Sequence, residues 1–334
     1  MSKCSKLKGF LLFCTAFLML SVTAFAKKEV YIGGFPFGIK MNTDGVYVSG
    51  VGEVESNAGK VSPAKTAGIR EGDLIISMNG KKLSSAQEVA EIIGESEGKM
   101  IETQLRRGDK TVKTNLVPAK TAEGEYKTGL FIKDSASGIG TVTYVEGDGQ
   151  HFGGLGHGVT DRSTAGILPL GSGSVHNAEI VDVTKGEKDI PGELRGIIDH
   201  KNAGELFGNT EMGVFGKFAV KREGLKKAEV ASSGEIKKGK CTIYSCLKGK
   251  APSELEGEIV EIVDKNAKTK NFIVRLTDKA CLEKTGGIVQ GMSGSPIIQN
   301  GKLVGAVTHV LMRDQTSGYG IFIENMMAEA EKIK

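Results

Sequence analysis

Apolar and polar residues alternate over short stretches of this chain, and glycine-containing turns separate the stretches. The segment Gly45–Val51 has the alternation of a half-buried β-strand, with Val46 and Val48 on the opposite side from Tyr47 and Ser49. Further β-rich runs lie at Gly138–Val145, Phe218–Val220, Thr242–Tyr244, Glu258–Val263 and Phe272–Leu276. Runs at this spacing predict a mainly β protein whose larger part is a barrel or a sandwich.

Two amphipathic helices interrupt the β pattern. The first covers residues 86–93, carries Val89 on its apolar face and is capped by Ser84 or Ser85. The second runs from Ile323 to Lys332, close to the end of the chain. Because the helices are few, the sequence predicts that strands carry most of the fold.

The first 26 residues have the composition of an export signal. Lys3, Lys6 and Lys8 precede an apolar run, and Ala24-Phe25-Ala26 supplies an A-x-A cleavage site. The run from Leu7 to Ala26 is 20 residues long, which also suffices for a membrane anchor. We therefore expect residues 1–26 to be a signal peptide or an anchor, and the rest of the chain to be exported.

Charge and cysteine content exclude several classes of function. Without residues 1–26, the chain has 41 basic and 40 acidic residues, which gives no electrostatic reason to expect nucleic acid as a partner. Cys241 and Cys246 could form a bridge, but two buried thiols fit the spacing better, and Cys281 has no obvious partner. No spacing of His and Cys resembles a zinc site, so we predict neither a metal nor a cofactor.

Residues 28–118 resemble a PDZ domain. The resemblance depends on the order of strands and helix and on the motif P-A-x-x-A-G-I-x-x-G-D-x-I at residues 63–75. It implies a peptide groove between Phe37-Gly38-Ile39 and the helix at 86–93, where a partner segment adds as an extra strand. A purely structural β-domain is the alternative. A polar linker at 119–126 then leads to a second unit at 127–334.

A serine in the second unit lies in a tight, glycine-rich turn. The residues are Gly291-Met292-Ser293-Gly294-Ser295-Pro296, followed by two apolar runs that Asn300-Gly301 joins as a hairpin. Such a turn exposes the Ser293 hydroxyl and frees the amides of Gly291 and Ser293 to form an oxyanion hole. An isolated motif of this kind is more often a flexible turn, so a nucleophile also requires a base and an acid.

Candidates for the base and the acid can be named, although the residues alone leave alternatives. His157 is surrounded by glycines, whereas the rival base His309 lies on an apolar strand pattern. Asp278, Asp161 and Asp314 are candidates for the acid that orients the base. Asp278 ranks slightly above Asp161, and a solvated turn is the alternative for all three.

Three longer stretches resemble the stage IV sporulation protein B serine peptidase family. They read GLGHGVTD, TGGIVQGMSGSPIIQNGKLVGAVTHV and SGYGIFIENM. The resemblance implies a PDZ-like α+β domain followed by a chymotrypsin-like double β-barrel. It also implies His157 as general base, Asp278 as orienting acid and Ser293 as nucleophile, with the amides of Gly291 and Ser293 as the oxyanion hole.

The same resemblance implies a biological role. The protein would be released between the two membranes around a developing forespore and would cleave a membrane-bound regulator, so that an intramembrane protease can process a sigma-factor precursor. Self-cleavage near the N-terminus, under control of the PDZ domain, is part of this expectation, and the groove would hold a peptide ligand or the chain's own N-terminal segment. The alternatives are a general quality-control serine protease and an exported PDZ scaffold whose peptidase-like domain is inactive.

Overall fold

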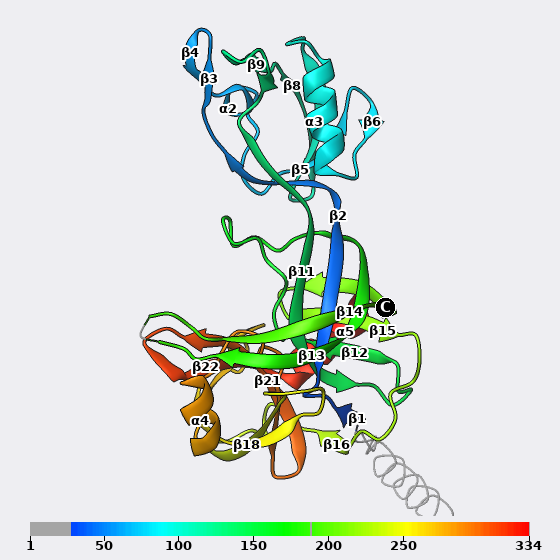
Figure 1. Ribbon diagram of the computed structural model, residues 1–334. Coiled ribbons are helices and arrows are strands. Elements are labelled where there is room, and N and C mark those ends of the chain that lie inside the picture. Colours follow the sequence, from blue (N-terminus) through cyan, green and yellow to red (C-terminus); the bar gives the residue numbers. More distant parts are fainter. Residues whose placement is uncertain (1–27, 188, 334) are drawn as a thin grey trace, which may run out of the picture.

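The structure, a computed structural model, describes residues 28–187 and 189–333, so the predicted leader at 1–26 lies outside the described residues. Strands dominate, which confirms the mainly β fold. Within the described ranges no helix is both long and apolar enough to cross a membrane. Two strands of 16 residues each, β2 (Pro36–Val51) and β11 (Leu130–Val145), run from the larger part of the molecule into a smaller domain (Figure 1).

The smaller domain is the PDZ-like one. Besides the ends of β2 and β11, it contains β3 (Val54–Ser56), β4 (Gly59–Val61), α2 (Pro63–Thr66), β5 (Leu74–Met78), β6 (Lys81–Lys82), α3 (Ala86–Glu95), β7 (Ile101–Arg107), β8 (Lys110–Leu116), β9 (Ala119–Lys120) and β10 (Tyr126–Lys127). The start of α3 is fixed by a capping box, in which the Ser85 side chain accepts from the Glu88 amide and the Glu88 carboxylate accepts from the Ser85 amide. Val89 and Ile93 on the inner face of α3 are buried, so the helix predicted from the sequence is confirmed.

The larger part contains two closed barrels. Barrel 1 is a ring in which β2, β11, β12 (His151–Gly154), β15 (Gly213–Phe218), β14 (Glu193–Thr210) and β13 (Leu170–Thr184) pair in that order before β13 returns to β2. The short β1 (Glu29–Ile32) pairs with β11 outside the ring. Buried phenylalanines fill the interior: Phe37 meets Phe152 edge to face, and Phe152 stacks on Phe218.

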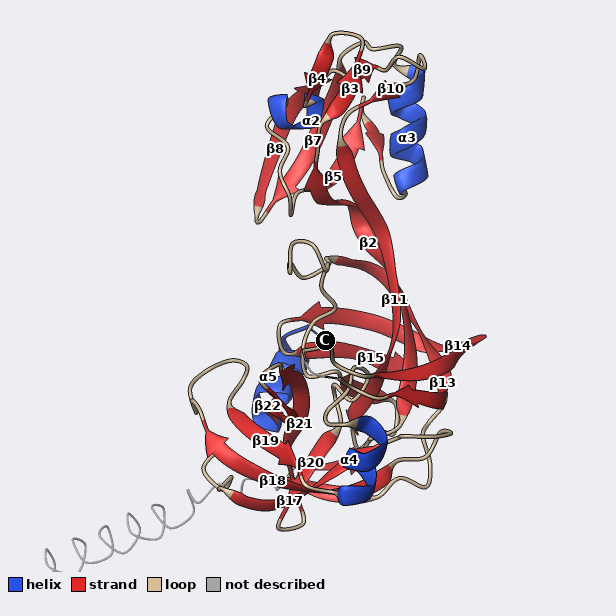
Figure 2. Cartoon of the chain, turned by 60° about the vertical axis from the view of Figure 1, so that its left-hand side comes forward, coloured by secondary structure: helices blue, strands red, loops and turns tan. Residues whose placement is uncertain are grey.

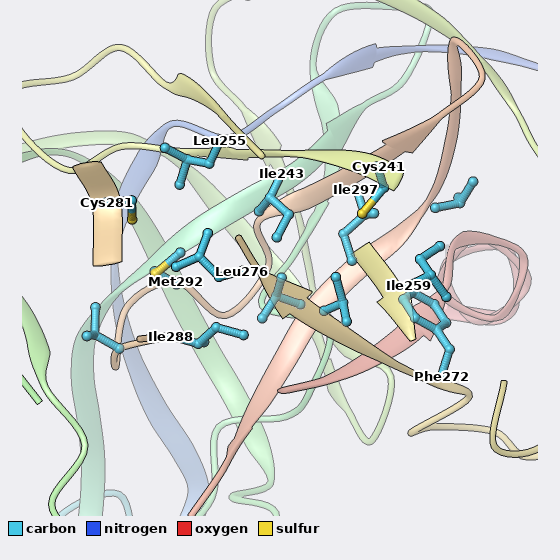
Figure 3. Packing of buried hydrophobic residues seen from close by; sticks show 14 of the residues in the cluster. Cys241, Ile243, Leu255, Ile259, Phe272, Leu276, Cys281, Ile288, Met292 and Ile297 are labelled. Carbon is cyan, nitrogen blue, oxygen red and sulfur yellow. The ribbon is translucent and has the colours of Figure 1, made fainter. Parts of the chain in front are cut away.

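Barrel 2 repeats the arrangement. Its ring consists of β17 (Gly239–Ser245), β18 (Ser253–Ile262), β19 (Phe272–Leu276), β22 (Asp314–Phe322), β21 (Lys302–Leu311) and β20 (Pro296–Gln299), and β20 closes on β17. The remaining elements are β16 (Lys227–Val230), α4 (Lys279–Thr285) and α5 (Ile323–Ile333). Figure 3 shows part of the core, in which Ile243, Ile259 and Phe272 are completely buried. Two closed antiparallel barrels confirm the predicted double-barrel architecture.

The boundary between the domains differs from the prediction of a PDZ-like unit at 28–118, a linker at 119–126 and a second unit at 127–334. The first part of β2 pairs with β13 in barrel 1, whereas Leu130–Lys133 of β11 pairs with Tyr47–Val51 in the PDZ-like domain. The PDZ-like domain is therefore inserted between two neighbouring strands of barrel 1, as Figure 2 shows. Alternation along a strand reveals which side chains are buried, but it does not reveal which domain buries them.

The predicted peptide-binding residues Phe37, Gly38 and Ile39 lie in barrel 1 and not in a groove. The segment pairs with β11 on one side and with β13 on the other, and only 1% of Phe37 and 3% of Ile39 is exposed. A strand that is paired on both edges cannot accept a further strand. The structure thus contradicts this part of the prediction, and the three residues support barrel 1.

Because Phe37 fills the core of barrel 1, we expect Phe37→Ala to lower the free energy of unfolding by about 3–5 kcal/mol. Urea denaturation followed by circular dichroism measures this change. Phe131→Ala is the matched control, since 61% of Phe131 is exposed, and its effect should stay within about 0.5 kcal/mol. Equal effects of the two substitutions would contradict the burial of Phe37.

Candidate active site

A cleft of about 580 Å³ is lined by residues of both barrels. His157, from the loop after β12, and Ser293, from the loop before β20, both line it, together with His309 from β21. A larger hollow of about 850 Å³ lies beside Phe35 and contains neither His157 nor Ser293. The structure thus brings the predicted base, the predicted nucleophile and the rival base into one cleft, although they are far apart in the sequence.

The loop of Ser293 has the tight turn that its glycines predict. Gly291 and Gly294 have φ angles of +96° and +93°, which residues other than glycine rarely adopt. A Cβ atom on Gly294 would lie 2.1 Å from the Thr141 carbonyl oxygen, so the loop packs directly against β11. In this conformation the Ser293 hydroxyl donates to the Thr308 carbonyl oxygen at 2.6 Å and not to the His157 ring.

The amides of Gly291 and Ser293 are candidates for an oxyanion hole. Among the residues that the structure describes, neither amide has a hydrogen-bond acceptor, whereas the Met292, Gly294 and Ser295 amides all donate to backbone carbonyls. The carbonyls on the opposite sides of the two peptide units are held, because the Gln290 oxygen accepts from Leu194 and the Met292 oxygen from Ser295. Since N–H and C=O point in opposite directions across a trans peptide, these contacts orient the two unused amides.

The ring of His157 has one nitrogen engaged by the backbone. Nδ1 lies 2.8 Å from the carbonyl oxygen of Gly158, so it carries the proton and leaves Nε2 as the basic nitrogen. Burial lowers the pKa of His157, while the hydrogen bond to Gly158 acts in the opposite direction. The ring therefore stays neutral, as a general base must be, at pH values near neutrality.

His309 lies against His157, with 4.6 Å between the ring centroids. Burial, followed by the charges of His157 and Lys270, lowers the pKa of His309 to about 4. Two neutral imidazoles therefore share one wall of the cleft. No cluster of His, Cys, Asp and Glu in residues 28–187 and 189–333 could hold a metal ion, and Cys241, Cys246 and Cys281 are buried free thiols.

Asp278, the predicted orienting acid, does not contact His157. It is the N-cap of α4, where its carboxylate accepts from the Cys281 amide at 2.8 Å and from the Glu256 amide at 3.4 Å. Helix α4 was not predicted, although an N-cap residue, Asp278, precedes it and a C-cap glycine, Gly286, follows it. Only Cys281 and Thr285 of this helix are buried, so its apolar pattern is weak. In this conformation the Gly158 carbonyl, and not a carboxylate, orients His157.

The two other acids also have structural partners. Asp161 is 1% exposed and forms an ion pair with Lys133 of β11 at 2.5 Å. Burial alone would raise the pKa of Asp161, but the hydrogen bonds from Lys133 and from the Thr164 and Ser163 amides lower it. Asp161 thus anchors the loop after His157. Asp314 accepts hydrogen bonds from Thr316 and Ser317 in its own turn.

A second hollow, of about 650 Å³, lies in the PDZ-like domain. It is bounded by Ala86, Val89, Ala90 and Ile93 of α3 and by Thr128–Ile132 at the start of β11. Leu130–Ile132 pairs with β2 on one side only, so its other edge is open toward α3. The groove predicted beside α3 therefore exists, but β11 and not Phe37–Ile39 forms its strand. In the sequence, Gly129-Leu130-Phe131-Ile132, a glycine followed by apolar residues, could have indicated this strand.

A comparison of two substitutions separates the capping role of Asp278 from its charge. We expect Asp278→Ala to lower the free energy of unfolding by about 1 kcal/mol, and Asp278→Asn to leave it unchanged, because Asn caps helices as well as Asp does. Urea denaturation measures both values. If Asp278→Asn is as unstable as Asp278→Ala, the carboxylate charge and not the cap stabilises α4. Because Asp278→Asn keeps the helix cap, the rate of peptide hydrolysis by this variant measures what the carboxylate charge contributes to the reaction.

Comparison with known proteins adds to this geometry. The family model for "SpoIVB peptidase S55" matches residues 124–327, and the model for "PDZ domain" matches residues 56–107. Serine protease HTRA1 of Xenopus tropicalis is 35% identical over 77 residues, which are 23% of this chain and 15% of that protein. This chain therefore covers only a small part of that relative.

Solved structures resemble parts of the chain weakly. The PDZ domain of the SdrC-like protein from Listeria monocytogenes is 25% identical and covers 27% of this chain and 87% of that domain, with a TM-score of 0.22. The HtrA-type protease AlgW with a decapeptide is 14% identical over 60% of this chain and 54% of AlgW, with a TM-score of 0.35. The family match, which spans more than half of the chain and includes both His157 and Ser293, is the stronger finding. The chain belongs to the SpoIVB peptidase S55 family, and it contains an inserted PDZ domain.

Proposed function

We propose that this protein is an exported serine endopeptidase of sporulation that cleaves a membrane-bound regulator and thereby triggers processing of a sigma-factor precursor. We also propose that its PDZ domain controls self-cleavage near the N-terminus. The family match supports the sporulation role, and the basic and apolar composition of residues 1–26 supports export, with release or anchoring between the membranes around the forespore. The observation that carries the peptidase chemistry is that Ser293 and His157 line the same cleft.

The chemistry assigned to the cleft is acyl transfer. Ser293 Oγ attacks the scissile carbonyl carbon, and His157 Nε2 takes the hydroxyl proton and then gives it to the leaving amine. The amides of Gly291 and Ser293 hold the oxyanion of the tetrahedral intermediate. Water, deprotonated by the same imidazole, then releases the acyl group from Ser293.

The resting positions of the side chains determine what must move first. The Ser293 hydroxyl donates to the Thr308 carbonyl oxygen, so this hydrogen bond has to break before the hydroxyl can donate to His157. The His157 tautomer needs no change, because its Nδ1 proton is already held by Gly158. For Asp278, the orienting acid implied by the family resemblance, the N-cap position gives no supporting contact.

The PDZ domain is proposed to bind a peptide segment of the protein substrate or of the chain's own N-terminal region. The segment would pair with the open edge of Leu130–Ile132, because an unpaired strand edge presents free N–H and C=O groups. Its side chains would enter the hollow beside Val89 and Ile93, whose apolar surface favours apolar residues. Proteolysis and peptide binding would then occur at two separate sites of one chain.

Ser293→Ala should abolish both casein hydrolysis and labelling by a fluorophosphonate, because the Ser293 hydroxyl supplies the attacking oxygen of the proposed reaction. His157→Ala should lose a comparable factor, and the double variant should lose no more, as expected for residues that act as one unit. Ser295→Ala is the matched control, since that hydroxyl is buried and bonds to Ser245, and it should still be labelled. Hydrolysis by the folded Ser293→Ala protein would refute the proposed nucleophile.

Peptides selected from a random library on the Ser293→Ala protein should bind the groove beside α3. We expect Ala90→Trp to weaken their binding by roughly 10-fold or more, because Ala90 lines the hollow and the indole fills it. Glu91→Trp places the same side chain on α3 outside the hollow, and it should leave the affinity unchanged. Fluorescence anisotropy measures both affinities, and equal values for the two variants would place the peptide elsewhere.

A further inference from the structure

Thr141, near the C-terminal end of β11, contacts the loops of both proposed catalytic residues. Its N–H donates to the Ser293 carbonyl oxygen at 3.2 Å, and its hydroxyl donates to the Gly291 carbonyl oxygen at 2.8 Å. Its own carbonyl oxygen accepts from the Leu155 amide at 3.1 Å, two residues before His157. Thr141 is 2% exposed, so water does not compete for these bonds.

On the side of Ser293, the hydroxyl of Thr141 acts on the most permissive residue of the loop. Glycine reaches positive and negative φ at similar cost, so a peptide unit next to Gly291 can reverse its direction easily. The Leu194 amide holds the peptide unit before Gly291, and the Thr141 hydroxyl holds the unit after it. With both units held, the unused Gly291 amide keeps one orientation.

On the side of His157, Thr141 holds a residue with an unfavourable backbone. Leu155 has a φ of +63°, which a residue other than glycine adopts only when its surroundings enforce it. The hydrogen bond to Thr141 and the burial of the Leu155 side chain in barrel 1 both favour this conformation. The path of the chain into His157 therefore depends on the same point of β11.

The three segments leave no space between them. A Cβ atom on Gly294 would lie 2.1 Å from the Thr141 oxygen and 2.5 Å from the Leu155 nitrogen. A shift of β11 at Thr141 consequently moves both loops, and neither loop can move far without the other. A displacement of about 1 Å in such a site can lower a reaction rate by roughly 100-fold.

We propose that Thr141 is a positioning residue of the peptidase reaction. Its hydroxyl fixes the position of the Ser293 loop at Gly291 relative to the loop of His157. This proposal deepens the proposed function and rests on the roles assigned there to Ser293 and His157. The proposed effect comes from one hydroxyl and not from the general packing of a buried strand.

The test uses the full chain and a fluorophosphonate, which needs no knowledge of the natural substrate. Ser293 Oγ forms a bond to phosphorus, the P–F bond breaks, fluoride leaves, and the serine proton passes to His157. We expect Thr141→Val to lower the first-order rate constant of labelling by roughly 10- to 100-fold without changing the concentration at half-saturation. Thr141→Ser should restore most of the rate, because it restores the hydroxyl.

Thr103→Val is the matched control. Thr103 is also fully buried, and its hydroxyl donates to a backbone carbonyl, that of Ile101 at 3.3 Å, in the PDZ domain. We expect this variant to be labelled at the wild-type rate even if its stability falls as much as that of Thr141→Val. Thr141→Cys, with a weaker donor at the same position, should be labelled at a rate between those of Ser and Val.

The outcomes separate the possible failures. Labelling of Thr141→Val at the wild-type rate overturns the proposal, and so does a slow rate that Thr141→Ser fails to restore. If Thr141→Val does not fold, the labelling rates of the wild type, Thr141→Ser and Thr141→Cys are compared instead. A fall in that order supports the proposal, and equal rates for all three overturn it. A wild-type protein that is not labelled at Ser293 overturns the proposed function and, with it, the role of Thr141.

Discussion

Strand β11 borders the groove beside α3 and also contacts both loops of the candidate active site. Its first residues, Leu130–Ile132, form the open side of the peptide groove, and the next one, Lys133, neutralises the buried carboxylate of Asp161. Further along, Thr141 bonds to the loops of Ser293 and His157. A paired strand is a stiff element with a fixed rise per residue, so these contacts are held at constant spacing. The groove and the cleft are consequently built on one continuous piece of backbone.

The insertion of the PDZ domain follows from the same strand. A separate module joined by a flexible linker could sample many orientations, whereas this domain enters through β2 and leaves through β11. The two strands pair with each other over Pro36–Asn42 and again over Tyr47–Val51, with an irregularity between these segments, so the connection is a ribbon of two paired strands. Ion pairing between Lys133 and Asp161 and the hydrogen bond between Tyr47 and Thr164 tie this ribbon to the loop after His157. Both contacts are partly buried, so solvent screens them less than fully exposed pairs.

Local structure could be predicted from the sequence where a short segment determines its own conformation. The Ser85 cap of α3, the Asn300-Gly301 hairpin and the glycine turn around Ser293 depend on neighbouring residues, and each matches the prediction. His157 was identified by its flanking glycines, and it does share a cleft with Ser293. Asp278 shows the complementary case: it caps α4 in the structure, and a carboxylate that caps a helix and one that orients a histidine look alike in a sequence. Only the position of the partner distinguishes them.

The sequence by itself determined several of the strands, the hairpin and turn of the serine motif, and the helices that begin at Ala86 and Ile323, because each follows from backbone preferences and side-chain alternation over a few residues. The long strands β13 and β14 lie outside every predicted β run. Tertiary structure alone decided which strands close each barrel, and therefore that Phe37–Ile39 lies in a core while Leu130–Ile132 borders a groove. It also decided that Thr141 meets Gly291, at a separation of 150 residues. Pairing between distant strands depends on the shape of the whole barrel, and no local pattern encodes that shape.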